Sequence, residues 1–180
     1  MNHRTALSIF LLAATNALAD EPKEVVIDFE QAEIGKPVPS WTEKGVAFSL
    51  ASAPKQGKAA GRVMFFPYIS TTRKGLLNAM ATEQSIPVQA VFSNRVSSVT
   101  VVFWGSTGCP ARLQAFDKDD KLVGEASVPA APVRKAPGDP VPQFELTVKA
   151  AEIAAIRFSG PRNGEFLAAD EVRFTPLAAK

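Results

Sequence analysis

Apolar and polar residues alternate along much of this chain. In residues 24–30 (EVVIDFE), the side chains of Val25, Ile27 and Phe29 fall on one side of an extended backbone. The same alternation recurs in four further segments, residues 46–50, 96–104, 144–148 and 172–174. Alternation with a period of two predicts β-strands that bury one face. The segments are rich in Val, Phe and Thr, which suit a half-buried pleated surface.

Turn-forming residues separate the predicted strands. Three Asp residues lie in residues 116–121 (FDKDDK), and Asp tolerates the left-handed backbone that a β-hairpin tip requires. Residues 160–164 (GPRNG) predict a second loop. Residues 129–142 hold five prolines. Because proline donates no hydrogen bond to a strand ladder, this segment is predicted to be a surface loop or a cover for a sheet edge.

Two segments fit more than one element. Residues 74–82 (KGLLNAMAT) fit either a short helix or an edge strand, and residues 149–154 (KAAEIA) fit one helical turn before a strand at 156–159. The regular spacing of strands and turns favours a sandwich or barrel, and no repeat or linker marks a second domain. We therefore predict a single all-β domain, a β-sandwich of about ten short antiparallel strands.

The N-terminus predicts a secretory signal. Residues 1–4 are positively charged, residues 6–15 (ALSIFLLAAT) are almost wholly apolar, and Ala17 and Ala19 form the small-residue pattern of a cleavage site. The apolar stretch is shorter than the roughly 20 residues that span a bilayer, although an uncleaved anchor remains the alternative. We expect residues 1–19 to be removed and residues 20–180 to fold in the periplasm or outside the cell, with no membrane span.

The composition excludes several classes of function. The net charge is only +2 and the basic clusters are short, so nucleic acid is not an expected partner. His3 is the only histidine and lies in the predicted signal, which leaves the mature chain no Ser-His-Asp triad and no histidine metal ligand. We therefore expect no enzyme, although a pair of carboxylates acting as a glycosidase stays open.

Cysteine chemistry is limited to one residue. Cys109 is the only cysteine, so no internal disulfide can form even though export would permit one. It lies in the turn sequence GSTGCP, which leaves both burial and intermolecular pairing open.

A family pattern emerges from the order of several segments. In chain order these are residues 26–30 (VIDFE), 44–49 (KGVAFS), 98–104, 112–117 (RLQAFD), 153–160 and 166–174 (FLAADEVRF). This order resembles secreted galactose-binding-domain-like jelly rolls, the fold of many carbohydrate-binding modules. Each motif is ordinary strand-and-turn sequence, so the likeness rests on their order over nearly the whole mature chain. It implies a single jelly-roll β-sandwich at residues 20–180, and it implies little about function because fold does not determine function.

The resemblance also implies a structural calcium ion between the opening and the closing strand. The matching residues are Asp28 and Glu30 in the opening strand and Asp170 or Glu171 in the closing strand. Carboxylates that meet there repel one another unless a cation lies between them, and calcium accepts about six to eight oxygen ligands in loose geometry. The alternative is that these acids face solvent on alternating strands or accept hydrogen bonds from loop amides.

Exposed aromatic side chains are the candidates for binding sugars, because the apolar faces of sugar rings stack on them. Tyr68 lies in the segment MFFPYIS, Trp41 lies in a Pro/Ser-rich loop, and Trp104 ends a strand before a Gly-rich turn. Arg73 would supply hydrogen bonds. For each tryptophan the alternative is burial in the core.

These observations predict an exported, non-catalytic module. We expect it to bind carbohydrate or another cell-surface component through loops at one end of the sandwich. The alternative is a structural or protein-interaction module of the cell envelope with no small-molecule ligand. Calcium is the only cofactor that enters these expectations.

Overall fold

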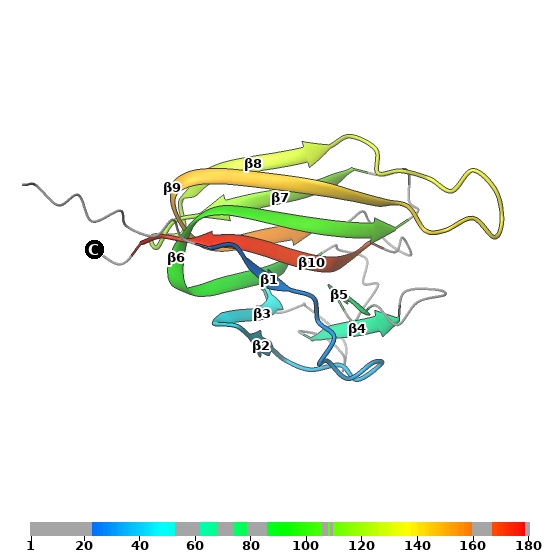
Figure 1. The fold of residues 1–180 in the computed structure, drawn as a ribbon, viewed down its shortest axis with the longest axis horizontal. Helices are drawn as coiled ribbons and strands as arrows, with labels where there is room; N and C mark the ends of the chain where they lie inside the picture. The colour runs from blue at the N-terminus through cyan, green and yellow to red at the C-terminus, as the bar shows by residue number, and fades with distance from the viewer. Residues whose placement is uncertain are drawn as a thin grey trace, which may run out of the picture.

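The alternating segments form ten β-strands among the residues that the structure describes. The computed structural model describes residues 23–52, 62–67, 74–78, 86–105, 108, 110–159 and 167–178. The strands are β1 (Val25–Ile27), β2 (Trp41–Glu43), β3 (Val46–Leu50), β4 (Val63–Pro67), β5 (Lys74–Asn78), β6 (Val88–Gly105), β7 (Ala111–Phe116), β8 (Leu122–Val128), β9 (Gln143–Ser159) and β10 (Leu167–Pro176). All ladders between named strands are antiparallel, and the described residues contain no helix (Figure 1). The all-β prediction is confirmed.

Two of the strands are long, whereas only short strands were expected. β6 has 18 residues and β9 has 17, and their ladder shifts register on either side of Val96. The first part of β6 pairs with β3, whereas its later part pairs with β10. The polar residues 93–95 interrupt the alternation at this irregularity without ending the strand. Such irregularities bend a strand, so one strand serves both layers of a sandwich.

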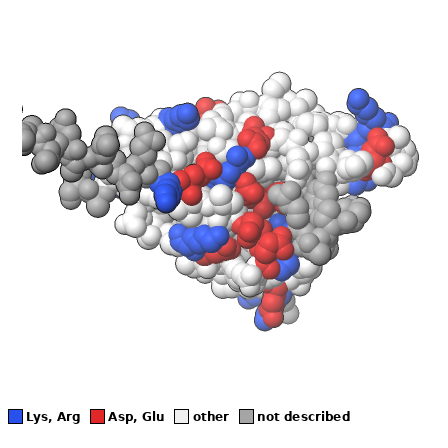
Figure 2. Space-filling view, viewed as in Figure 1, with Lys and Arg blue, Asp and Glu red and all other residues white. Residues whose placement is uncertain are grey.

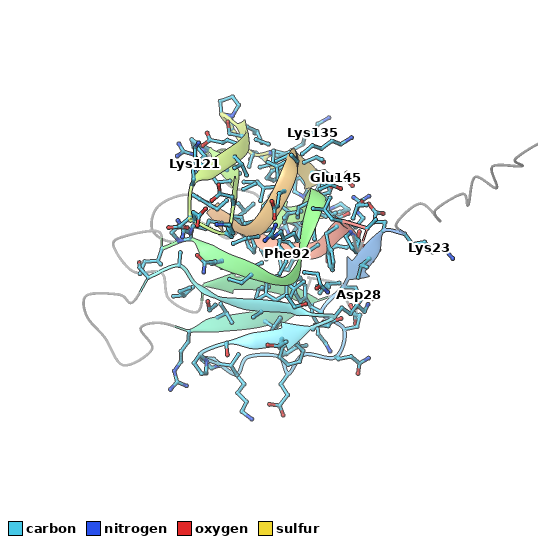
Figure 3. The ribbon with its side chains drawn as sticks, turned by 90° about the vertical axis from the view of Figure 1, so that its left-hand side faces the viewer. Lys23, Asp28, Phe92, Lys121, Lys135 and Glu145 are labelled. Carbon is cyan, nitrogen blue, oxygen red and sulfur yellow. The ribbon has the colours of Figure 1, made fainter. Side chains whose placement is uncertain are left out.

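The bend of β6 and β9 folds one sheet into two layers (Figures 1 and 3). The sheet order is β4-β5-β10-β6-β9-β7-β8, with β1 beside β10, β3 beside β6 and β2 beside β3. We use the name five-strand layer for β3, the first part of β6, the last part of β9, β7 and β8. The opposite layer contains β1, β10, the later part of β6 and the first part of β9.

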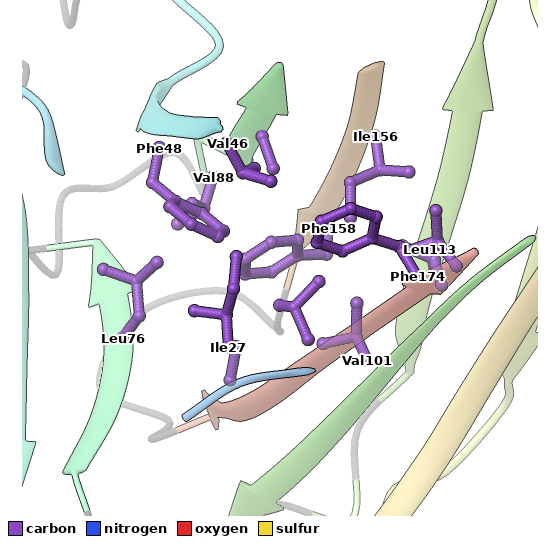
Figure 4. Packing of buried hydrophobic residues seen from close by; sticks show 14 of the residues in the cluster. Ile27, Val46, Phe48, Leu76, Val88, Val101, Leu113, Ile156, Phe158 and Phe174 are labelled. Atoms are coloured by element: carbon purple, nitrogen blue, oxygen red, sulfur yellow. The ribbon is translucent and has the colours of Figure 1, made fainter. Parts of the chain in front are cut away.

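An apolar core fills the space between the layers (Figure 4). Side chains from eight strands meet there, including Ile27, Val46, Phe48, Leu76, Val88, Val101, Leu113, Ile156, Phe158 and Phe174. Each of these is at most 6% exposed. Burying one such side chain contributes about 1.5–3 kcal/mol, so this core is the main source of stability. The residues that alternate with them on the same strands lie on the outer faces of the two layers.

One edge of the sheet is covered and the other is open among the described strands. The outer side of β4 is covered by residues 34–38, whose backbone bonds include Gly35 N–H to Phe65 O and Val38 N–H to Val63 O, both 2.9 Å. Beyond β8, no further described strand pairs. Edge strands with free backbone groups invite pairing, so the cover over β4 has a protective effect.

Two tight turns close the β2–β3 and β7–β8 hairpins. Lys44 and Gly45 join β2 to β3 with φ values of 46° and 76°, the two left-handed positions of a type I′ turn. The hairpin predicted at residues 116–121 is confirmed by the antiparallel β7–β8 ladder. There Asp117 Oδ1 accepts hydrogen bonds from the backbone N–H groups of Asp119 (2.9 Å) and Lys121 (3.0 Å). The bond from Lys121 is the main cause that lowers the pKa of Asp117.

The structure decides between the alternatives for the ambiguous segments. Lys74–Asn78 is strand β5, paired with β4 on one side and β10 on the other, so it is a strand but not an edge strand. Residues 79–82 lie outside the described residues. Residues 149–154 belong to β9, so the helical turn considered there is wrong. Pairing with β6 across the register shift holds this Ala-rich stretch extended, against its local preference.

The proline-rich segment 129–142 connects β8 to β9 and contains no strand, as predicted. It projects beyond the ends of the strands (Figure 1), and Ala131 and Val141 are its buried residues. The predicted signal at residues 1–19, the loop at 160–164 and Cys109 lie outside the described residues. Among the residues described, no helix has the length and apolarity needed to cross a membrane.

Candidate functional site

The structure places only part of the predicted sugar-binding set. Tyr68 and Arg73 lie outside the described residues, so their role remains a prediction. Trp41 lies on β2 and is half-buried, with its ring edge-on to Phe65 at 5.2 Å between centroids. The indole Nε1 of Trp41 is buried and has no hydrogen-bond partner among the described residues. Trp41 therefore packs against the core and presents only part of its ring to solvent.

Trp104 is buried, so the expectation that it offers an exposed ring is wrong. Its side chain is 1% exposed, although its position on β6 points it to the outer face of the opposite layer. Val141 from segment 129–142 and Ala168 from β10 pack against it in a small second cluster. Gly75 of β5 lies so close that a Cβ there would be 2.6 Å from the indole ring. Long-range contacts thus cover a residue whose local sequence suggested exposure.

The opening and closing strands pair, as the calcium hypothesis required. β1 and β10 form an antiparallel ladder from Val25–Phe174 to Ile27–Val172. The ladder ends there because the chain turns at Phe29, which has a φ of 59°. Asp28 is exposed, and its Oδ1 accepts a hydrogen bond of 3.3 Å from the Glu30 N–H. Asp28 and Glu30 therefore follow the last paired residue of β1 and are not part of its ladder with β10.

Asp170 lies in a different environment from the other two acids. It is 1% exposed and occupies a bulge of β10, between Ala169 and Glu171. Its Oδ2 accepts a hydrogen bond of 3.0 Å from Gln143 Nε2. The described residues contain no group of three or more Asp, Glu, His or Cys side chains able to hold one metal ion. The acids named from the sequence do not fit a shared calcium ion in this arrangement.

A row of polar side chains crosses the outer face of the five-strand layer. Adjacent positions in the ladders define this polar row, which consists of Ser49, Gln89, Arg157, Gln114 and Glu125. Their strand neighbours point into the core, which places these side chains outward. Each is half-buried or exposed, so the row is open to solvent. No sequence motif indicated it, because its members come from five separate strands.

The centre of the polar row is held in place by several contacts. Arg157 Nε donates to Gln89 Oε1 at 2.8 Å, and a second guanidinium nitrogen pairs with Asp120 in the β7–β8 turn. The guanidinium carbon also lies 4.2 Å from the centroid of the Phe116 ring, in cation–π geometry. Gln114 Nε2 donates to Glu125 Oε2 at 2.7 Å. These planar groups are therefore fixed before any ligand arrives.

An apolar row runs beside the polar row, two residues along β3, β6, β9 and β7 and three residues along β8, where the ladder shifts register. It consists of Ala47, Val91, Ala155, Phe116 and Leu122. Val91 is 42% exposed and Leu122 is 46% exposed, while Phe116 lies under Arg157. The strip is therefore exposed at Ala47, Val91 and Leu122 and covered at Phe116. An apolar strip bordered by fixed polar groups is typical of a binding surface. The two rows together form the candidate site.

The opposite layer has a different outer surface. There Arg173 forms ion pairs with Glu171 (2.9 Å) and with Glu145, and Thr100 bonds Thr147 at 2.8 Å between hydroxyl oxygens. Figure 2 shows acidic and basic side chains intermixed on the visible face of the molecule. No broad basic stripe of the kind that binds nucleic acid covers that face.

Comparisons with known proteins found no match to any family model and none among curated protein sequences. Among solved structures, the apo form of BiXyn10A CBM1 is 11% identical, covers 88% of this chain and 100% of its own, and has a TM-score of 0.43. The K3 adhesin domain of Lys-gingipain from Porphyromonas gingivalis is 14% identical, covers 84% of this chain and 98% of its own, and has a TM-score of 0.41.

A third similar structure is a family 43 arabinoxylan arabinofuranohydrolase from Bacillus subtilis, solved in complex with cellotetraose. It is 15% identical with a TM-score of 0.36, and the match covers 66% of this chain but only 26% of the hydrolase. At these identities and TM-scores, none of the three structures assigns a fold family or a function to this chain.

Proposed function

We propose that this chain is an exported, non-catalytic module that binds carbohydrate on the outer face of the five-strand layer. The observation that supports this most directly is the polar row lying beside the apolar row. A sugar ring has C–H groups on its faces and hydroxyl groups at its edge. The apolar row suits the ring faces, and the amide, guanidinium and carboxylate groups of the polar row suit pairs of hydroxyls.

The fixed geometry of the polar row favours binding energetically. Ordering a long side chain when a ligand binds costs roughly 0.5–1.5 kcal/mol. Arg157 and Gln114 are already held by Gln89 and Glu125, so much of this cost is met in the free protein. The proposal places binding on this face because its side chains and their contacts are described; the role predicted for Tyr68 and Arg73, which lie outside the described residues, stays a prediction.

The absence of catalysis and the export of the chain are parts of the same proposal. Removal of residues 1–19 would leave a chain without histidine and with one cysteine, so the common nucleophile–base pairs are not available to it. A periplasmic or extracellular module meets polymeric glycans directly. Mass measurement of the secreted protein should give an N-terminus at Asp20.

A retention assay tests the proposal with Gln114→Ala. Residues 20–180 should bind at least one insoluble polysaccharide in a panel that covers cellulose, xylan, mannan, chitin and peptidoglycan. The variant removes one hydrogen-bonding group and frees Glu125, so we expect affinity to fall about tenfold. Because the acids do not share an ion, chelator should leave retention unchanged.

Thr147→Ala is the matched control, since Thr147 lies on β9 like Arg157 but on the outer face of the opposite layer. It should bind like the unmodified chain, and the unfolding midpoints of both variants should confirm that they fold. Equal retention of Gln114→Ala and the unmodified chain would exclude this face, and no retention on any polysaccharide would exclude the proposed function.

A structural or protein-interaction role in the cell envelope is the second candidate. The exposed side chains of Val91 and Leu122 favour it, since apolar contact area also suits a protein partner. The open side of β8 adds backbone groups that another strand can pair with. Capture of one envelope protein by the unmodified chain, abolished by Leu122→Asp and coupled with failure on every polysaccharide, would establish this role instead.

A further inference from the structure

The two rows have a direction and a length. Both run across the strands, from β3 through β6, β9 and β7 to β8, and five strands spaced about 4.8 Å apart span roughly 19 Å. The units of an extended β-linked sugar chain repeat at a spacing comparable to the distance of about 4.8 Å between neighbouring strands. A single sugar would cover only one or two positions of each row. The repeat of the protein surface therefore matches the repeat of a polymer.

Both ends of the polar row are open among the described residues, whereas the apolar row continues from Ala47 to Thr42 of β2. At one end, β8 has no strand beyond it. At the other end, β2 pairs with residues Val46 to Phe48 of β3 only, so no described strand lies beside Ser49, the last residue of the polar row. A site that recognises the terminus of a glycan needs a wall at one end. Open ends instead allow a chain to continue in both directions.

The charged groups of this face are paired with one another. Arg157 pairs with Asp120, Arg112 Nε lies 3.8 Å from Glu125 Oε1, and in the adjoining turn Lys118 pairs with Asp119 at 2.7 Å. Each of these three positive charges thus has a negative partner, and Lys121 of the same turn lies near Asp117, so the charges of the described residues of this face balance. Its remaining hydrogen-bonding capacity suits neutral hydroxyl groups.

From these three observations we infer that the ligand is the interior of a linear, uncharged polysaccharide that lies across the strands and contacts about four consecutive sugar units. This inference rests on the proposed function and specifies its substrate class. The chain direction is perpendicular to the strands, with ring faces over the apolar row and ring edges along the polar row.

Calorimetry with cello-, xylo- and manno-oligosaccharides of one to six units tests the length. The association constant of the best series should rise at least tenfold from two to four units and then level off. Blocking the non-reducing end or reducing the other end of the six-unit chain should change affinity less than twofold. Binding of one sugar as tightly as six, or loss of binding on blocking an end, would overturn the inference while leaving carbohydrate binding intact.

Affinity electrophoresis in hydroxyethylcellulose, neutral xylan and carboxymethylcellulose tests the charge. We expect a neutral polymer to retard the chain more strongly than the charged one, with less than a twofold effect of salt. Preferential retardation by the charged polymer, weakened by salt, would overturn the inference. Glu125 and Ser49 lie at opposite ends of the polar row. In the calorimetric series, Glu125→Ala and Ser49→Ala should each make the association constant level off at an oligosaccharide about one sugar unit shorter. Absence of binding to all of these probes would instead refute the proposed function.

Discussion

At the scale of single residues, Gly75 and Trp104 depend on each other. The indole ring of Trp104 occupies the space where a side chain at position 75 would lie, with Cζ2 and Nε1 both 2.6 Å from an ideal Cβ. The Cβ of Ala168 closes the same space from β10 at 2.7 Å. Position 75 therefore requires glycine because the Trp104 ring and the Ala168 side chain leave no room for a Cβ, and not because of a positive φ. The ring of Trp104 therefore packs directly against the backbone of β5.

Gly75→Ala should therefore destabilise the fold. Overpacking against a buried ring costs about 1–3 kcal/mol, because Trp104 has to leave its position. Gly124→Ala on β8 is the matched control, since its Cβ would meet only ordinary contacts at 3.6 Å or more. That control should be neutral or stabilising by roughly 0.5–1 kcal/mol. Urea unfolding of both variants measures the difference, and equal midpoints would contradict the proposed packing.

Asp117 predicts a pH dependence of stability. The N–H of Lys121 is the main cause that lowers the pKa of this carboxyl below its ordinary value of 3.8, and the N–H of Asp119 also contributes. A lowered pKa in the folded state means that the ionised carboxylate stabilises the turn above its ordinary pKa. This contribution is lost as the pH falls through the lowered value. Asp117→Ala should thus lower the unfolding midpoint at neutral pH.

The difference between Asp117→Ala and the unmodified chain should shrink as the pH falls below 3.8. Asp139→Ala is a suitable comparison, because Asp139 also accepts a backbone hydrogen bond, from the Ala136 N–H at 2.9 Å, but lies in the segment 129–142 outside any hairpin. A difference that stays constant from neutral to acidic pH would show that ionisation of Asp117 does not support the turn.

At the scale of elements, segment 129–142 acts as a cover. Val141 is 7% exposed and packs on Trp104, and Gly105 N–H bonds Pro142 O at 3.2 Å. A proline-rich loop suits this position because it needs no strand partner of its own. The loop removes from solvent an aromatic ring that its strand presents outward.

Val141→Ala should loosen this cover. In a Trp41→Phe background Trp104 is the only tryptophan, so its fluorescence reports on the cluster alone. The substitution removes two buried methyl groups, worth about 1–2 kcal/mol, and should shift emission to the red and increase acrylamide quenching. Val133→Ala on the same loop should do neither, because Val133 is 59% exposed. Identical quenching in both variants would rule out the cover.

At the scale of the whole molecule, β6 and β9 hold the two layers together. Their ladder extends from Val88–Phe158 to Trp104–Gln143, so it forms part of both layers. β2, by contrast, has three residues and pairs with β3 alone. No disulfide supplements these contacts, since Cys109 is the only cysteine. Cooperative unfolding is therefore expected to centre on β6 and β9.

Native-state hydrogen exchange should separate these strands. Amides in the β6–β9 ladder should exchange only through global unfolding, whereas those of β2 should exchange through local opening at lower free energy. Reducing agent should change neither class. Exchange of β6 amides at the rate seen in β2 would mean that the two layers unfold independently.

The alternation of apolar residues was sufficient to predict most strands, because burial of one face imposes a period of two directly on the sequence. The turn at residues 116–121 and the loop at 129–142 were likewise predictable, since the backbone chemistry of Asp and Pro is local. That β6 and β9 each continue as one long strand was not predictable from the sequence. Pairing between distant segments holds their polar and Ala-rich residues extended through the bend.

The sequence alone thus determined the all-β class, the positions of the clearest strands and turns, and the absence of histidine chemistry beyond residue 3. Only the tertiary structure decided that Trp104 is covered, that Asp170 is buried while Asp28 is exposed, and that Gln89 and Arg157, 68 positions apart, hydrogen-bond each other. The physical reason is range. Periodicity and turn chemistry act between near neighbours, whereas a binding face forms where the ladder register aligns side chains from strands far apart in the sequence.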